Sequence, residues 1–188
     1  MDTERVRELI HQLLIEIGED PDREGLIKTP ERFTDAIAFL TKGYHENIDD
    51  VVNSAVFSSE ANNMIILRDI EVYSLCEHHM LPFYGKCHIG YIADKQVIGV
   101  SKIARIVETY ARRLQIQERL TAQIAKEIRN CVNADGVGVV MECRHLCMMM
   151  RGVEKQNSLM TTSSVLGCFQ TSLATRQEFL NLIGRHVV

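Results

Sequence analysis

Hydrophobic side chains recur at helical spacing near the start of the chain. They fall at every third or fourth position over residues 6–17, and Gly18 follows as a stop signal. A second helix is predicted behind an N-cap threonine, with Pro30 in its first turn and an end near Gly43. We therefore predict an N-terminal helical region over residues 1–60.

The pattern then changes to the two-residue alternation of β-strands. Two strands, two helices, two strands and a last helix follow one another, over residues 70–76, 83–93, 101–113, 117–132, 137–150, 159–167 and 172–183. Strands that pair in sequence order around a helical hairpin favour an α+β fold with an antiparallel sheet. We predict that residues 61–188 form this α+β domain as one compact unit. The two middle helices can cover only one face of the sheet, so we expect oligomerisation to bury the other.

Composition and charge narrow the class of protein. Of the 188 residues, 46% are hydrophobic and 24% are charged, which is typical of a globular domain. No apolar run approaches the roughly 18 residues of a membrane helix, and the charged start of the chain lacks the apolar core of a signal peptide. We expect a cytoplasmic protein with no membrane partner. The net charge of −4 and the lack of a long basic block also argue against a nucleic-acid partner.

Two short segments carry the side chains that zinc prefers. They are Cys-Glu-His-His at residues 76–79 and Cys-Arg-His-Leu-Cys at residues 143–147. A catalytic zinc site takes three such ligands and leaves one position for water. On a continuous strand, Cys143 and Cys147 would lie roughly 13 Å apart, so at most one of them can bind the metal. His145 would share a strand face with Cys147, so one of the two could bind while the other acts beside the metal.

The six cysteines allow other interpretations. A disulfide framework is not expected in a reducing compartment. A buried free cysteine is usually a small hydrophobe, and we interpret Cys87, Cys131 and Cys168 in this way. A redox pair of Cys76 with Cys147 is a further alternative, which the same reducing compartment disfavours.

Polar and cationic residues gather where the middle helices begin. Ser101, Lys102 and Arg105 lie in the first turns of one helix, where free N–H groups and the helix dipole bind phosphate. A lysine there is unfavourable unless an anion offsets its charge, so the segment is either an anion site or a solvated helix face. Glu118 opens the next helix, where the residue pattern alone favours an ordinary partner of the helix dipole over a binding residue. Three nearby arginines are interpreted as surface or interface charges: Arg112, Arg113 and Arg119.

Four motifs in sequence order form a pattern that resembles a known family. They are SLCEHH at residues 74–79, GVSKIARIV at 99–107, QIQERLT at 115–121, and HLCM at 145–148 with RGV at 151–153. Together they resemble the GTP cyclohydrolase I family, most closely its animal-type members, and the similarity covers nearly the whole chain. The resemblance implies the tunnelling fold, an α+β fold whose subunits join their sheets into a ring. It also implies a homodecamer of two stacked pentamers, with active sites between subunits.

The resemblance assigns roles to single residues. Cys76, His79 and Cys147 match the zinc ligands of the family, and His78 and His145 match its catalytic histidines. Six further residues match positions that bind the substrate. Glu118, with Gln117, corresponds to the guanine anchor, and the ribose and triphosphate positions are Ser101, Lys102, Arg105 and Arg151.

The reaction that the resemblance implies is the zinc-dependent hydrolysis of GTP at guanine C8. Formate is released, and the remainder rearranges to 7,8-dihydroneopterin triphosphate. His145 would protonate a ring nitrogen of guanine, and His78 would transfer protons in the later steps. The product feeds folate or tetrahydrobiopterin synthesis, and the animal-like match favours the latter, with allosteric control by GTP and a feedback regulatory protein. One departure from the family is Cys143 with Arg144, which stand where it has small or apolar residues, and Cys143 would add a thiol near the site.

Two alternatives remain open. Another tunnelling-fold enzyme, such as a nitrile reductase that acts on a deazaguanine, would use a nucleophilic cysteine and NADPH instead of zinc. A non-catalytic zinc module would close the metal with four ligands and leave no position for water. Its ligands would be Cys76, His78 or His79, His145 and Cys147. Such a module would leave the charged residues of the other motifs without a role.

Overall fold

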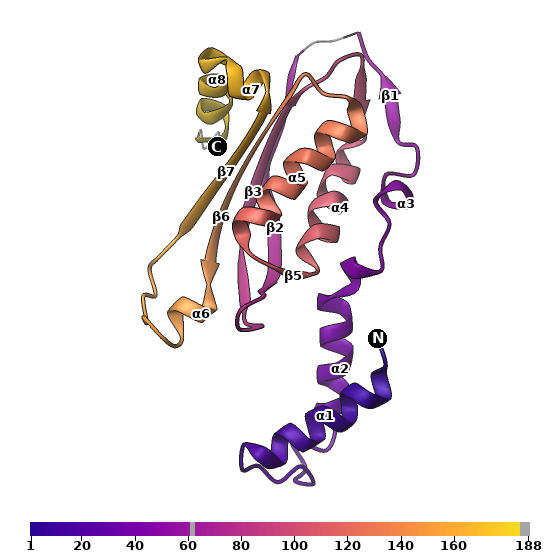
Figure 1. The fold of residues 1–188 in the computed structure, drawn as a ribbon, viewed down its shortest axis with the longest axis vertical. Helices are drawn as coiled ribbons and strands as arrows, with labels where there is room; N and C mark the ends of the chain where they lie inside the picture. The colour runs from indigo at the N-terminus through magenta and orange to yellow at the C-terminus, as the bar shows by residue number, and fades with distance from the viewer. Residues whose placement is uncertain (61–62, 185–188) are drawn as a thin grey trace. The chain divides into compact units, whose positions relative to one another are not determined.

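The computed structural model describes residues 1–60 and 63–184 of the chain (Figure 1). The chain forms two compact units, Met1–Lys42 and Gly43–Val188. The domain boundary predicted after residue 60 stays a prediction. None of the helices in the described residues is both long enough and apolar enough to cross a membrane.

The first unit is a pair of helices, α1 (Thr3–Glu16) and α2 (Thr29–Leu40), which pack against each other. The Asp2 side chain caps α1 by accepting a hydrogen bond from a backbone amide of the first turn. Gly18, just beyond α1, has a φ of 88°, as its role as a stop signal predicts. The N-cap of α2 is Lys28, and the threonine predicted as the cap is the first residue of the helix.

The second unit is built on a five-stranded sheet. From Lys42 onward the elements in chain order are η1 (Lys42–Tyr44), α3 (Ile48–Val52), β1 (Val56–Ser58), β2 (Met64–Cys76), β3 (Pro82–Ile92), β4 (Gln96–Ile98), α4 (Val100–Ala111), β5 (Leu114–Gln115), α5 (Gln117–Val132), β6 (Gly136–His145), α6 (Leu146–Met149), β7 (Met160–Gly167), α7 (Cys168–Thr171) and α8 (Leu173–Gly184). The order in the main sheet is β5-β2-β3-β6-β7, and β1 pairs separately with β4. All pairs in the main sheet are antiparallel except β2 with β5. The predicted α+β class is confirmed.

The middle helices α4 and α5 lie side by side on one face of the main sheet (Figure 1). Their inward residues, among them Ile103, Ile106 and Ile124, are fully buried. They belong to the same hydrophobic core as Ile89 and Val139 of the sheet. The apolar positions of both helices recur every three or four residues, which is the pattern of a helix with one buried face.

The opposite face of the sheet is covered in part by the C-terminal helices. Phe169 of α7 and Phe179 of α8 are fully buried in a second, smaller core. A Cβ atom on Gly90 or Gly138 would lie 2.7 Å from one of these rings, so the two glycines make room for them. α7 and α8 therefore bury part of the face that we expected oligomerisation to bury.

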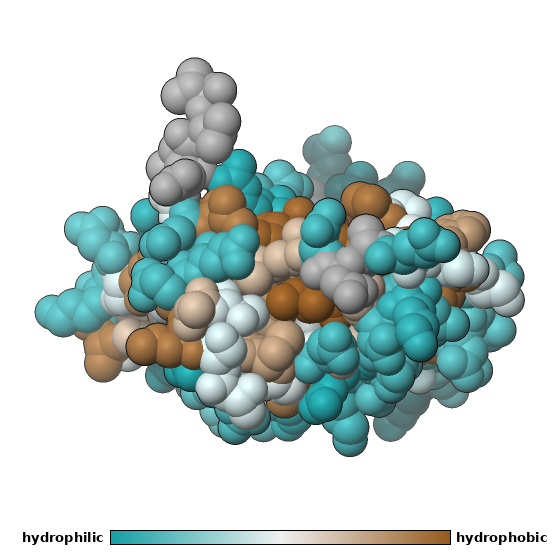
Figure 2. Space-filling view, turned by 90° about the horizontal axis from the view of Figure 1, so that it is seen from above, coloured by the Kyte–Doolittle hydropathy of each residue, from teal (hydrophilic) through white to brown (hydrophobic). Residues whose placement is uncertain are grey.

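Aromatic side chains stay exposed elsewhere on this face. Tyr73 and Tyr84 stack with ring centroids 6.4 Å apart and are 48% and 37% exposed. In the view from above, hydrophobic side chains also reach the surface between hydrophilic ones (Figure 2). The second unit thus keeps apolar surface that its own elements do not cover.

Two strands differ in extent from their predictions. β2 begins at Met64, before the predicted start at residue 70, because a bulge between Leu67 and Ile70 breaks the two-residue alternation upstream of that start. β6 ends at His145 instead of continuing to residue 150, because the chain turns into α6 there. The prediction that His145 and Cys147 share a strand face is therefore wrong, since Cys147 lies on a helical turn.

Candidate metal centre and active site

A tight turn after β2 presents the first cysteine and histidine motif. The Cys76 amide donates to the Leu81 carbonyl at 2.9 Å, and the Met80 amide donates to the Cys76 carbonyl at 2.8 Å. Met80 has a left-handed backbone with φ of 53°. The Glu77 amide donates to the Gln115 carbonyl at 3.0 Å, so the turn is also tied to β5.

The second motif reaches the same place from the end of β6, where His145 pairs with Phe83 of β3. The helical turn α6 then carries Cys147 towards the first motif. The ligand atoms of Cys76, His79 and Cys147 all lie within 4.8 Å of one another. In the part of the chain that the structure describes, this is the one group of histidine, cysteine or acidic side chains that could hold a metal ion.

The donor set of this group fits zinc. Two thiols and one imidazole are ligand types that zinc prefers, and three ligands leave a position for water. Burial raises the pKa of the Cys147 thiol, and the neighbouring Cys76 raises this pKa further. A divalent cation between the two sulfur atoms would reverse both effects, because it favours the thiolate.

The two histidines predicted to be catalytic have different surroundings. His78 is exposed, and its Nδ1 lies 3.7 Å from Cys76 Sγ. His145 is half-buried, and its ring stacks on Phe83 with centroids 4.7 Å apart and an interplanar angle of 8°. Burial lowers the pKa of His145, whereas the nearby Glu118 carboxylate raises it. Neither histidine joins the three-residue group, so the closed four-ligand arrangement is not formed among the described residues.

Gln117 is fully buried and contacts His145. Its Oε1 lies 2.8 Å from His145 Nε2. Its amide nitrogen donates to the carbonyls of Met141 and Met160 at 3.0 and 2.9 Å, and to Thr162 Oγ1 at 3.1 Å. These acceptors fix the orientation of the amide, so Oε1 accepts and His145 Nε2 carries the proton. The sequence predicted Gln117 as a substrate residue, and no pattern in it signals this contact with the histidine.

Two predicted substrate residues lie near the metal group. Glu118 is exposed in the first turn of α5 and is close enough to His145 to affect its pKa. Arg151 is exposed beyond α6 and acts to lower the pKa of the Cys147 thiol. A carboxylate and a cation are therefore present close to the metal group and to His145.

The other three predicted substrate residues lie elsewhere in the chain. Ser101 and Lys102 lie in the first turn of α4 and Arg105 in the second, whereas the end of α4 leads into β5 beside Cys76. A helix of 12 residues is about 18 Å long, so one chain does not bring the first turn of α4 to the metal group. The Lys102 ammonium instead donates to the Val51 carbonyl at 2.8 Å.

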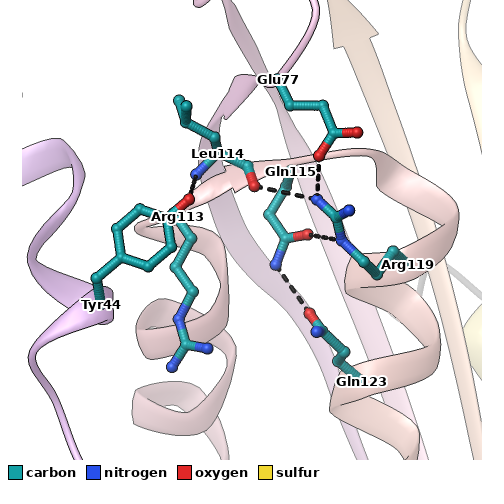
Figure 3. A pocket seen from close by; sticks show the side chains of 7 residues that line it. All are labelled: Tyr44, Glu77, Arg113, Leu114, Gln115, Arg119 and Gln123. Carbon is teal, nitrogen blue, oxygen red and sulfur yellow. Dashed lines mark hydrogen bonds and ion pairs between the residues drawn. The ribbon is translucent and has the colours of Figure 1, made fainter.

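A cavity of about 410 Å³ lies beside the first motif, next to Glu77 (Figure 3). Arg119 lines it and forms an ion pair with Glu77. Arg119 also donates to Gln115 Oε1 at 3.0 Å and to the Leu114 carbonyl at 3.1 Å. Arg119 is thus an exposed charge that also has partners within the chain. The other two arginines also have partners in the chain, Arg112 with Glu108 and Arg113 with the Gly43 carbonyl.

The remaining cysteines lie outside the metal group. Cys143 is fully buried in the core, and burial raises the pKa of its thiol to about 12. Cys87 is fully buried in the same core, and burial raises its pKa as well. Cys131 is half-buried on α5, where burial and the Glu127 carboxylate raise its pKa to about 11. Cys143 thus packs as a hydrophobe and contributes no thiol to the metal group.

The fold and the site define an α+β protein with a three-ligand metal site and a histidine beside it. The model of the family described as GTP cyclohydrolase I matches residues 6–184. The chain belongs to the GTP cyclohydrolase I family.

Several proteins that are similar to this chain, and nearly as long, are named GTP cyclohydrolase 1. GTP cyclohydrolase 1 of Methylococcus capsulatus is 64% identical over 177 residues, which is 94% of this chain and 96% of the relative. The enzyme of that name from Leptospira biflexa is 59% identical, with 93% and 96% covered, and GTP cyclohydrolase 1 2 of Pseudomonas putida is 57% identical, with 94% and 95% covered. These bacterial relatives do not test the predicted closeness to animal-type members.

Among solved structures, the archaeosine synthase QueF-Like in its apo form superposes with a TM-score of 0.47 at 15% identity. The match covers 57% of this chain and 97% of that one. A likeness at this level carries no argument about the present chain.

Proposed function

We propose that this chain has GTP cyclohydrolase I activity and converts GTP to 7,8-dihydroneopterin triphosphate with release of formate. The observation that carries the proposal is the metal group of Cys76, His79 and Cys147 with His145 beside it. Family membership over residues 6–184 supplies the substrate class. Activity requires water to react at guanine C8, and a three-ligand metal site leaves a position for water.

The metal of this site is zinc in our proposal, held by Cys76, His79 and Cys147. When bound, zinc supplies Lewis acidity and lowers the pKa of water in the open position to about 7. The role of the protein is to hold the three ligand atoms within 4.8 Å of one another and to keep a fourth side chain away from the metal.

His145 is placed to move a proton at the guanine ring. Gln117 Oε1 accepts a hydrogen bond from the Nε2–H of His145, so Nδ1 is the ring nitrogen available to the substrate. Stacking on Phe83 keeps the plane of the imidazole fixed. His78 is exposed next to the ligands, and we assign to it the proton transfers that accompany ribose rearrangement and ring closure.

Glu118 binds the guanine base. A carboxylate accepts hydrogen bonds from guanine N1–H and from the 2-amino group, a donor pattern that adenine lacks. The Glu118 carboxylate is near enough to His145 to raise the pKa of the imidazole, so a base held by this carboxylate would lie near the histidine. Gln117 contributes to the same anchor only through its backbone at the start of α5, because its side chain holds His145.

The ribose and triphosphate are bound by Ser101, Lys102, Arg105 and Arg151. Because α4 begins about one helix length from the metal group, a second subunit would have to supply its first turn. A homodecamer of two stacked pentamers, with active sites between subunits, meets this need. The open edge of β7 and the exposed aromatic pair on the sheet are surfaces that such an assembly would bury.

The product serves tetrahydrobiopterin synthesis in our proposal, with folate synthesis as the other destination of the same compound. The support is the resemblance of the four motifs to animal-type members. The same resemblance supports allosteric control by GTP and binding of a feedback regulatory protein. Isothermal titration with that class of regulatory protein, with and without GTP, tests this part separately from the reaction.

The reaction is tested by incubating the zinc-loaded full chain with GTP and following products by mass spectrometry. We expect formate and 7,8-dihydroneopterin triphosphate, and neither with protein stripped of metal by a chelator. Cys147→Ser should lose zinc and turnover together, because it removes one of three ligands. Unchanged GTP with zinc bound would favour the non-catalytic module, and turnover that requires NADPH would favour the reductase.

A further inference from the structure

The pocket in Figure 3 lies between the turn that carries two metal ligands and the start of α5. We propose that Glu77 and Arg119 form a positioning pair that fixes the ligand turn against the first turn of α5. The inference rests on the proposed function, because it concerns the metal group of the same site.

Glu77 connects the ligand turn to the segment before α5 in two ways. It directly follows the ligand Cys76, which is in register with Gln115 of β5. The backbone amide of Glu77 donates to the Gln115 carbonyl at 3.0 Å. Its carboxylate forms the ion pair with Arg119 and does not belong to the metal group. Both the main chain and the side chain of this residue are therefore committed to positioning.

Arg119 receives the carboxylate with a guanidinium that is held at two further points. Nε donates to Gln115 Oε1 at 3.0 Å, and Nη2 donates to the Leu114 carbonyl at 3.1 Å. Gln115 is itself 2% exposed, and its amide donates to the Tyr110 carbonyl at 3.0 Å and to Gln123 Oε1 at 2.9 Å. The planar fork of arginine can meet these acceptors together, and the single ammonium of lysine cannot.

The pair acts on geometry more than on the stability of the fold. The side chains of Arg119 and Glu77 are 41% and 34% exposed, and ion pairs at such positions contribute little to the stability of a fold. A cation in the first turn of α5 also opposes the helix dipole, which the Glu77 carboxylate offsets. The pair therefore acts by fixing the positions of the groups on either side of it.

Those groups are the two halves of the candidate active site. On one side are Cys76 and His79, which precede and follow Glu77 in the turn. On the other side is the first turn of α5, which carries Gln117 with its bond to His145. The pair thus sets the spacing between the ligands and the residues that hold the histidine and the base.

The test measures zinc affinity in the full chain by competition with a chromophoric chelator. Glu77→Ala and Arg119→Ala should each weaken zinc binding about tenfold, which is the lower end for residues that orient metal ligands. The double variant should be no weaker than either single one within about twofold, because both changes remove the same interaction. With Co²⁺ in place of zinc, the thiolate-to-metal absorption should change in the variants, which is a readout independent of turnover.

Matched variants separate positioning from loss of any charge. Lys86→Ala breaks an exposed ion pair with Asp69 elsewhere on the sheet and should leave zinc affinity and the Co²⁺ spectrum unchanged. Arg119→Lys should bind zinc as weakly as Arg119→Ala, since it keeps the charge without the fork. Glu77→Gln keeps an acceptor and should show an intermediate loss, so it carries the test if an alanine variant does not fold by circular dichroism.

Zinc affinities of both single variants equal to that of the wild type would overturn the proposal. Losses that multiply in the double variant, or full recovery by Arg119→Lys, would overturn it as well. A wild-type chain that binds no zinc would instead contradict the proposed function, and the inference would fall with it.

Discussion

At the residue scale, Gln117 and Glu118 are neighbours in sequence with opposite surroundings. Gln117 is fully buried with every polar atom of its side chain engaged, whereas Glu118 is exposed beside His145. In the proposed function the buried amide orients a histidine and the exposed carboxylate binds a base, so removing one should have a different effect from removing the other. Substitution at the two positions therefore separates positioning from substrate binding.

Glu118→Ala should lower kcat/KM for GTP by about 100-fold or more, because the donors of guanine lose their acceptor. Zinc content should stay at the wild-type level, since Glu118 is not in the metal group. Steady-state kinetics together with metal analysis of the purified variant check both parts. Wild-type turnover by this variant would show that another residue binds the base.

Gln117→Ala should lower kcat by about 100-fold while KM for GTP stays within about threefold, because it frees His145 without removing a substrate contact. The buried carbonyls of Met141 and Met160 lose their donor, so unfolding should become easier by about 1–3 kcal/mol. Nitrogen NMR of the histidine ring should show the loss of the fixed Nε2 tautomer. A raised KM with unchanged kcat would instead support the prediction that Gln117 binds substrate.

The three residues of the metal group could be predicted from residue type and from the family resemblance, and the partners of Gln117 and Arg119 could not. Cysteine and histidine are possible metal ligands by their chemistry alone, wherever they stand in the sequence. Gln117 and Arg119 depend on partners that are distant in sequence, His145 for the first and Glu77 for the second. No local pattern in the sequence indicates such a contact, so these partners could not be predicted.

At the element scale, long periodic segments were predictable and short apolar ones were not. α5 has the predicted bounds of residues 117–132, because its apolar stripe extends over four turns. The apolar run at residues 146–150 looks like a continued strand, yet it contains the helical turn α6. Over so few residues, a strand and a single helical turn bury the same residue types, and only the tertiary structure decides between them.

The bulge in β2 depends on one histidine of β3. Asp69, with φ of 58°, donates its amide to His88 Nδ1 at 3.2 Å. Burial lowers the pKa of His88; the carboxylates of Asp69 and Glu142 oppose this shift, and the cations Lys86 and Arg68 add to it. A proton on Nδ1 would remove the acceptor of the bulge amide, so the neutral imidazole is the form that fits the fold.

Because the pKa of His88 is lowered on folding, its contribution to stability is present above the unfolded pKa of about 6.5. This contribution is lost as the pH falls through the lower folded pKa. The midpoint of urea unfolding should therefore be lower at about pH 5 than at about pH 7.5. His88→Gln keeps an acceptor without titrating and should show a smaller decrease between these pH values. An equal decrease in both proteins would remove His88 from the explanation.

At the scale of the whole molecule, one chain separates the cations of α4 from the metal group. If the site is shared between subunits, two inactive variants should complement each other. Cys147→Ser and Lys102→Ala should each lack activity, and oligomers assembled from both should regain part of it. Native mass spectrometry should show multiples of the 21.4 kDa chain, with a decamer as the expected species. Mixed oligomers without activity would indicate that each site is built within one chain.

The sequence predicts which elements cover one face of the sheet, but not which elements cover the other. The apolar stripes of α4 and α5 indicate that they pack on a sheet, and they do. Nothing in residues 168–184 indicates that Phe169 and Phe179 pack on the other face, because the fit depends on two glycines in distant strands. Oligomerisation was therefore expected to bury a larger part of the sheet than is left open.

The two metal-binding motifs close a long stretch of chain that contains β3, α4, α5 and β6. A metal held by Cys76 and Cys147 would cross-link the two ends of this stretch. Such a cross-link stabilises the fold because it restricts the conformations of the unfolded chain. Stripping the metal should then lower the melting temperature and speed hydrogen exchange at the ends of β2 and β6 that lie next to the metal group. The supply of metal would thereby govern how long a folded chain persists, as well as whether it turns over substrate.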